Sequence, residues 1–194
     1  VGVSVGQNDV PGVALAVGEG ARVSGRILFD GDNPPVGNQL KAWAITLGPA
    51  SALSSPAVAT NRAPVDERGQ FVSPGYPGGR YWINANVQSG GGAMQWLPKA
   101  VTAGGRDGLA APLDLALGDV DDVVITMTNK LAQVTGTVRV DSGTVARTAT
   151  VVLIPVTYRP GQVTSSWRRP RQMQASDQGV YSVGALVPGD YFVV

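Results

Sequence analysis

Histidine and cysteine are both absent from the 194-residue chain. Without cysteine, the chain can form neither a disulfide framework nor a catalytic thiolate. Without histidine, it lacks the usual general base of hydrolases and the commonest protein ligand of zinc. These absences exclude most familiar hydrolase and zinc chemistries. We therefore expect a protein that is not an enzyme and that holds no cofactor.

Net charge and long apolar runs are also scarce. The formal charge is +1, so electrostatics gives no reason to expect a nucleic-acid partner. No stretch approaches the ~20 consecutive apolar residues of a transmembrane helix, so no membrane span is expected. Apolar residues nevertheless make up 43% of the chain, which is too many for a disordered polypeptide.

Glycine and proline are abundant, with 26 and 14 residues, and they separate short runs of valine, alanine, leucine and isoleucine. Frequent turn residues between short apolar runs are typical of an all-β sandwich. No window of helical length has apolar residues at the helical period. The sequence therefore predicts an all-β fold.

The sequence also repeats itself, and Ser176 stands 110 positions after its counterpart Asp66. The matching pairs are VSGRI (23–27) with VTGTV (134–138), DERGQF (66–71) with SDQGVY (176–181), and PGGRY (77–81) with VPGDY (187–191). Upstream of each copy, NDVPGVALAVGEGARVSGRI (8–27) matches GDVDDVVITMTNKLAQVTGTV (118–138) in pattern. Both begin with an acidic lead, followed by an alternating apolar strand, a turn and the next strand. A fixed repeat of this length indicates tandem domains.

The repeat divides the chain into three parts. Residues 1–19 have the pattern of the terminal strand of a preceding unit, or of a donor strand. Residues 20–130 form a complete β-sandwich unit with linker strands. Residues 131–194 form a second unit, expected to be C-terminally incomplete because no counterpart of residues 93–130 follows.

Apolar alternation predicts the strands of both units. In the complete unit they are 22–30, 40–47, 57–60, 70–73, 81–87, 95–102 and 122–128, with a mostly irregular stretch at 103–117. In the following unit they are 134–140, 148–155, 171–175, 180–183 and 191–194. The tryptophans of the complete unit, Trp43, Trp82 and Trp96, are expected in the core.

The order of these motifs has a physical reason. In DERGQF and SDQGVY a glycine allows a turn with positive φ, the aromatic enters the core, and a Pro-Gly turn later reverses the chain. Together with VSGRILFDG and VTGTVRVDSG, these motifs resemble the carboxypeptidase regulatory-like domains. This is an Ig-like, transthyretin-like β-sandwich family close to the collagen-adhesin B-type repeats. The resemblance covers most of residues 20–90 and 132–194, and it implies a non-catalytic module that is extracellular or at a bacterial cell surface.

Three carboxylates gather at Asp119, Asp121 and Asp122. Clusters of oxygen ligands suit Ca²⁺, which makes these residues candidates for a metal site. Their spacing matches no complete calcium loop, however. The alternative is a solvated lead-in to a strand, whose charges discourage unwanted sheet pairing.

The stretch SSWRRPRQ joins Trp167 to Arg168, Arg169 and Arg171. An aromatic ring among arginines suits an anionic polysaccharide, or an acidic strand of another subunit. The alternative is an exposed edge strand protected by its charges and by Pro170.

Val13, Leu15 and Val17 alternate in the N-terminal segment, which has the strand type that the last unit lacks. Addition of this strand to the unit that begins at Leu131 of another chain would complete that sandwich. A head-to-tail contact that does not close makes a filament. We expect a structural or interaction protein whose partners are copies of itself or adjacent domains of the same protein. The alternative is a carbohydrate- or ligand-binding accessory module of a larger surface receptor or secreted enzyme.

Overall fold

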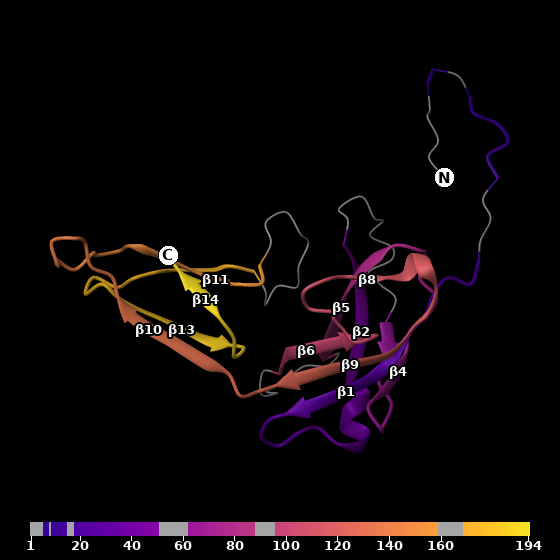
Figure 1. The fold of residues 1–194 in the computed structure, drawn as a ribbon, viewed down its shortest axis with the longest axis horizontal. Helices are drawn as coiled ribbons and strands as arrows, with labels where there is room; N and C mark the ends of the chain where they lie inside the picture. Colours follow the sequence, from indigo (N-terminus) through magenta and orange to yellow (C-terminus); the bar gives the residue numbers. More distant parts are fainter. Residues whose placement is uncertain (1–5, 8, 15–17, 51–61, 88–95, 159–168) are drawn as a thin grey trace.

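The computed structural model describes residues 6–7, 9–14, 18–50, 62–87, 96–158 and 169–194. These residues form four β-sheets, which confirms the predicted all-β fold (Figure 1). Within these ranges, no helix is long and apolar enough to cross a membrane.

Two sheets built from residues 23–128 face each other around a shared core, and we call them the first sandwich. One has the strand order β4-β1-β9-β6-β7 and the other β3-β2-β5-β8. The first sheet contains β1 (Val23–Asp30), β4 (Gln70–Val72), β6 (Leu97–Ala103), β7 (Arg106–Asp107) and β9 (Val120–Thr128). The second contains β2 (Trp43–Pro49), β3 (Arg62–Pro64), β5 (Arg80–Val87) and β8 (Leu113–Asp114). The 3-10 helices η1 (Gly37–Ala42) and η3 (Leu115–Leu117) connect these strands.

Aromatic residues fill much of the first core. The Phe29 ring meets Trp43 and Trp96 edge to face, with ring centroids 5.1 and 5.0 Å apart. Trp43 is buried and Trp96 packs against the cluster, so the core prediction is confirmed for both. Trp82 is also buried.

The remaining two sheets form the second sandwich, which has a much smaller core. They are β10 (Ala132–Thr137) paired with β13 (Val180–Leu186), and the order β12-β11-β14, made of Arg171–Gln174, Thr150–Pro155 and Tyr191–Val193. Its buried cluster consists of Val151, Leu153, Val183 and Leu186.

The turn within DERGQF (66–71) and the turn within its copy SDQGVY (176–181) are built in the same way. The Asp66 carboxylate accepts hydrogen bonds from the backbone N–H groups of residues 68 and 70, both at 2.8 Å. The Ser176 hydroxyl accepts the same pair from residues 178 and 180, at 3.3 and 3.2 Å. Gly69 and Gly179 follow with φ of 79° and 69°, so the predicted glycine turn is confirmed in each copy.

One predicted strand begins too early. We expected residues 40–47 to be extended, but residues 37–42 form η1 and β2 begins only at Trp43. The Gln39 side chain accepts a hydrogen bond from the Val36 N–H, and the Gln39 N–H donates back to the Val36 carbonyl. This turn buries Leu40, which the alternation pattern had assigned to a strand. The predicted strand at 57–60 lies outside the described residues.

A three-residue link, 129–131, joins β9 to β10 and is fastened to the end of β1. The Asn129 amide pairs with the backbone of Asp32, accepting from its N–H at 3.0 Å and donating to its carbonyl at 2.8 Å. The Asp30 carboxylate binds the ammonium groups of Lys99 at 2.5 Å and Lys130 at 2.9 Å. The direction in which the chain enters β10 is therefore set by the first sandwich.

Candidate functional site

The contact between β1 and β9 shows how a strand of this repeat docks onto its neighbour. The two strands run parallel, with Val23 opposite Val120 and Gly25 opposite Val123, and the pairing continues to Asp30 opposite Thr128. Asp121 and Asp122 have no partner in this register, so they form a bulge. After the bulge, three side chains of β9 face inward and are buried in the core of the first sandwich: Val123, Ile125 and Met127.

Gly25 permits this close approach. A Cβ atom added to Gly25 would lie 1.9 Å from the Val123 carbonyl oxygen, a distance that no side chain can occupy. The glycine of VSGRI is therefore required by the backbone of β9, not by a turn in β1.

The predicted metal-site carboxylates lie at the start of the same contact. The Asp119 carboxylate accepts a hydrogen bond from the Arg22 N–H at 2.8 Å. The Asp121 carboxylate accepts one from the Ser24 hydroxyl at 2.6 Å. Both side chains thus fasten β9 to the segment that begins β1. Among the described residues, no group of three or more acidic, histidine or cysteine side chains is arranged to hold a metal ion.

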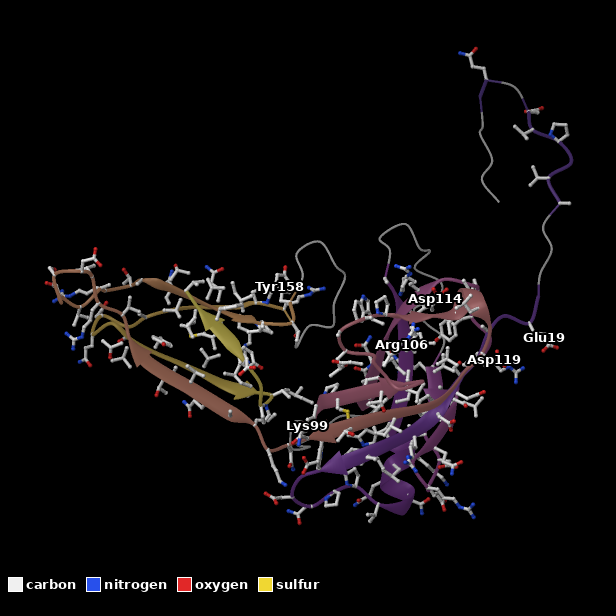
Figure 2. All side chains as sticks on the ribbon, viewed as in Figure 1. Glu19, Lys99, Arg106, Asp114, Asp119 and Tyr158 are labelled. Carbon is white, nitrogen blue, oxygen red and sulfur yellow. The ribbon has the colours of Figure 1, made fainter. Side chains whose placement is uncertain are left out.

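Figure 2 shows Asp119 and Lys99 at opposite ends of the first sandwich. Asp119 marks the end where β9 begins, and Lys99 lies at the end near the second sandwich.

The Lys99 hydrogen bond to Asp30, with help from Lys130, lowers the pKa of the Asp30 carboxyl to about 2. Asp30 therefore stays ionised at any ordinary pH, and its ion pairs with Lys99 and Lys130 are kept.

β10 is the counterpart of β1, but its surroundings differ. VTG at 134–136 repeats VSG at 23–25, and β13 pairs with β10 as β4 pairs with β1. In the part of the chain that the structure describes, no strand pairs with the other edge of β10. We call this the free edge of β10. Val134 and Val138 lie only partly buried against the small second core.

The N-terminal residues 9–14 lie away from both sandwiches (Figure 1), and their side chains are exposed. Val13, predicted to contact a partner, is 47% exposed. Leu15 and Val17 lie outside the described residues. Gly12 has a φ of 78°, and Asp122, its counterpart 110 positions later, has a φ of 56°. Sequence reasoning missed this shared backbone geometry, because an aspartate gives little sign of a left-handed conformation.

The predicted basic cluster is described only in part. Trp167 and Arg168 lie outside the described residues. Arg169 is exposed, and the Arg171 guanidinium donates to the carbonyl oxygens of Gly184 and Ala185 at 2.8 and 3.4 Å. Both arginines line a cleft of about 770 Å³ between the sandwiches. The first sandwich contributes Trp43, Thr46, Asn84, Asn86 and Trp96 to the same cleft.

The chain is similar to known proteins only at the level of solved structures. No family model matches the chain, and no curated protein sequence matches it. A solved structure of the Bacillus anthracis TIE protein aligns with 90% of this chain at 11% identity and a TM-score of 0.30. A streptococcal ancillary pilin aligns with 89% at 12% identity and a TM-score of 0.36. The chain spans 30% and 52% of the lengths of these two proteins. At TM-scores this low, neither similarity supports a functional conclusion.

Proposed function

We propose that the chain is a non-catalytic structural or interaction protein, made of tandem β-sandwiches and located at a bacterial cell surface or outside the cell. In this proposal a strand of one copy adds to the free edge of β10 in another, and repetition of the contact builds a head-to-tail filament. The observation that carries the proposal is the free edge itself. In β10 the residues VTG (134–136) repeat VSG (23–25) of β1, and β1 is paired along its length with β9.

The composition of the N-terminal segment supports this assignment. Val13 corresponds to Val123, and Leu15 and Val17 correspond in sequence to Ile125 and Met127. The three β9 side chains are buried in the first core. Burying one aliphatic side chain of this size contributes about 1.5–3 kcal/mol. An added strand would thus supply the second sandwich with apolar contacts that its own small core lacks.

Self-association of the full chain tests the proposal. We expect its mass in light scattering to rise with concentration above 20.0 kDa, with fibres visible in electron micrographs. Val13→Asp should abolish both, because it places a carboxylate in the acceptor core. Ala14→Asp is the matched control, since the neighbouring residue of a strand faces the opposite side. A wild-type chain that stays at 20.0 kDa at all concentrations would rule out addition between copies.

The intact mass of the native polypeptide distinguishes two forms of the proposal. A native mass near 20.0 kDa, together with regular fibres, supports strand exchange between separate chains. A much larger native mass supports the same strand addition between adjacent domains of one polypeptide.

The cleft between the sandwiches favours a second candidate function, the binding of an anionic polysaccharide. Two arginines, two tryptophans and two asparagine amides line one cavity, which suits a carboxylated sugar chain. Titration with oligogalacturonate, followed by tryptophan fluorescence, tests this candidate. Arg169→Gln should weaken binding, whereas Arg147→Gln, an exposed arginine that does not line the cleft, should not. An unchanged fluorescence in the wild-type protein would exclude this ligand.

A further inference from the structure

We propose that residues 9–14 dock onto the free edge of β10 of a second copy in the parallel register that β9 has on β1. Val10 would lie opposite Val134, Val13 opposite Gly136 and Ala14 opposite Thr137. This inference rests on the proposed function and adds to it the direction, the register and the residues that fix them.

The bulge provides the first argument. In β9 the register shifts between Val120 and Val123, and the second bulge residue, Asp122, is left-handed. Pro11 and Gly12 occupy the two corresponding positions in the N-terminal segment. Proline is tolerated where a strand residue has no ladder partner, and glycine is the residue best suited to positive φ. Gly12 has a φ of 78°, the same sign as the φ of 56° at Asp122 in the bulge of β9.

The acceptor edge provides the second argument. Gly136 stands in VTG where Gly25 stands in VSG, and Gly25 admits the Val123 carbonyl at a distance that excludes a side chain. In the second sandwich the side chain of Tyr181, a residue of β13, lies across this space, with its hydroxyl oxygen 2.5 Å from the position of a Cβ atom added to Gly136. Its counterpart in the first sandwich, Phe71, is buried in the core. Docking would therefore turn the Tyr181 ring inward and leave the space above Gly136 to the carbonyl of Val13.

The aspartate at the start of the N-terminal segment, Asp9, provides the third argument. Asp9 corresponds to Asp119, whose carboxylate accepts from the Arg22 N–H beside β1. The residue that corresponds to Arg22 is Gln133. In the proposed register the Asp9 carboxylate accepts from the Gln133 N–H, which fixes the start of the strand. Pro11 replaces Asp121, so the second anchor of the first sandwich has no equivalent here.

Engineered disulfides test the register, because the chain has no cysteine of its own. Ala14→Cys combined with Thr137→Cys places two thiols at directly opposed positions of the proposed ladder. We expect mild oxidation of the full chain to give a series of covalent multimers in steps of 20.0 kDa, which collapse on reduction. Ala14→Cys with Arg139→Cys keeps the same face but shifts one thiol by two residues. The shifted pair should not link, because disulfides require Cα atoms within ~7 Å.

Backbone variants supply an independent readout in the cysteine-free chain. Gly12→Val should weaken self-association roughly tenfold, since a β-branched residue resists the left-handed bulge. Gly6→Val is the matched control, because Gly6 has no positive φ and nothing within 4 Å of an added Cβ atom.

The outcomes separate this inference from the function on which it rests. If the wild-type chain self-associates but the shifted pair links, or Gly12→Val has no effect, the register is wrong and strand addition stands. If the Ala14–Thr137 disulfide forms only within monomers, the occupant is not a second copy. If the wild-type chain does not self-associate at any concentration, the proposed function itself fails.

Discussion

Two tyrosines, one in each sandwich, stabilise the Pro-Gly turn by the same side-chain hydrogen bond. The Tyr81 hydroxyl donates to the Pro77 carbonyl at 2.9 Å, and the Tyr191 hydroxyl donates to the Val187 carbonyl at 2.8 Å. In both cases the acceptor lies four residues earlier. Each hydrogen bond therefore ties the turn to the strand that follows it, at a tyrosine that is itself paired with a neighbouring strand.

We expect Tyr81→Phe and Tyr191→Phe each to lower the free energy of unfolding by about 1 kcal/mol, because each removes one intramolecular hydrogen bond. Urea denaturation, followed separately for each sandwich, measures the change. Tyr181→Phe is the control, since among the described contacts its hydroxyl has no hydrogen bond. A decrease in unfolding free energy below ~0.5 kcal/mol for both variants would be no larger than that of a neutral surface substitution. It would show that these hydrogen bonds do not stabilise the turns.

Asp30 makes the anchoring of the link sensitive to acid. Its ordinary pKa of 3.8 is lowered to about 2 in the folded protein, first by the Lys99 hydrogen bond and then by Lys130. A carboxyl group with a lowered folded-state pKa stabilises the fold fully above its unfolded pKa. That contribution is lost as the pH falls toward the folded value.

Asp30→Asn should therefore lower the Tm at pH 6. The difference from the wild type should shrink below pH 4 and be mostly lost at pH 2, where about half of the folded carboxyl groups are protonated. Asp177→Asn is the control, because it removes an exposed carboxylate of the second sandwich that makes no side-chain hydrogen bond or ion pair among the described contacts. High salt at pH 6 should also reduce the Asp30→Asn difference, since the pairs are partly exposed. A difference that persists unchanged at pH 2 would mean that charge is not the cause.

At the scale of elements, β9 holds the first sandwich together through its contact with β1. Gly25→Ala would force the added methyl group against the Val123 carbonyl. We expect a loss of roughly 1–3 kcal/mol in unfolding free energy, the usual cost of overpacking. Calorimetry measures it, with Gly184→Ala as control, since nothing lies within 4 Å of a Cβ atom added there. If Gly25→Ala is as stable as Gly184→Ala, β9 does not approach β1 as closely as described.

Several elements could be predicted from the sequence because alternation, turn residues and the repeat agreed. The strands at 22–30, 70–73 and 122–128 and the glycine turns are examples. The helix η1 could not be predicted from alternation, because Leu40 has the same apolar character whether a strand or a short 3-10 helix buries it. The unit boundaries at 19 and 130 remain predictions.

The candidate site was predictable only in outline. The repeat aligns Val13 with a strand of the first core. The cluster of carboxylates at 119–122 indicates that Asp119 and Asp121 belong to a functional or structural site. The role of these carboxylates could not be read from the sequence. It depends on a parallel contact with residues 97 positions away, Arg22 and Ser24. The bulge could not be predicted either, because the sequence around Asp122 does not indicate that its φ is positive.

At the scale of the whole molecule, the two sandwiches should differ in stability, because the buried cluster of the second is far smaller. We expect two calorimetric transitions at low protein concentration, with the second sandwich melting first. A peptide with the sequence of residues 119–130 should raise the lower transition, by about 2.7 kcal/mol in unfolding free energy at a hundredfold excess over Kd. The same peptide with Val123→Asp is the control. A single transition, or equal effects of the two peptides, would contradict this view.

The parallel pairing of β1 and β9 has a mechanical consequence. β1 is where the chain enters the first sandwich and β9 is where it leaves. Tension along the polypeptide therefore drags these two strands past each other lengthwise. The evenly spaced hydrogen bonds of a parallel ladder then share the load at once, instead of opening one after another. A chain of such domains would resist stretching at this contact, while the hairpin turns between the other strands would bear little of the force.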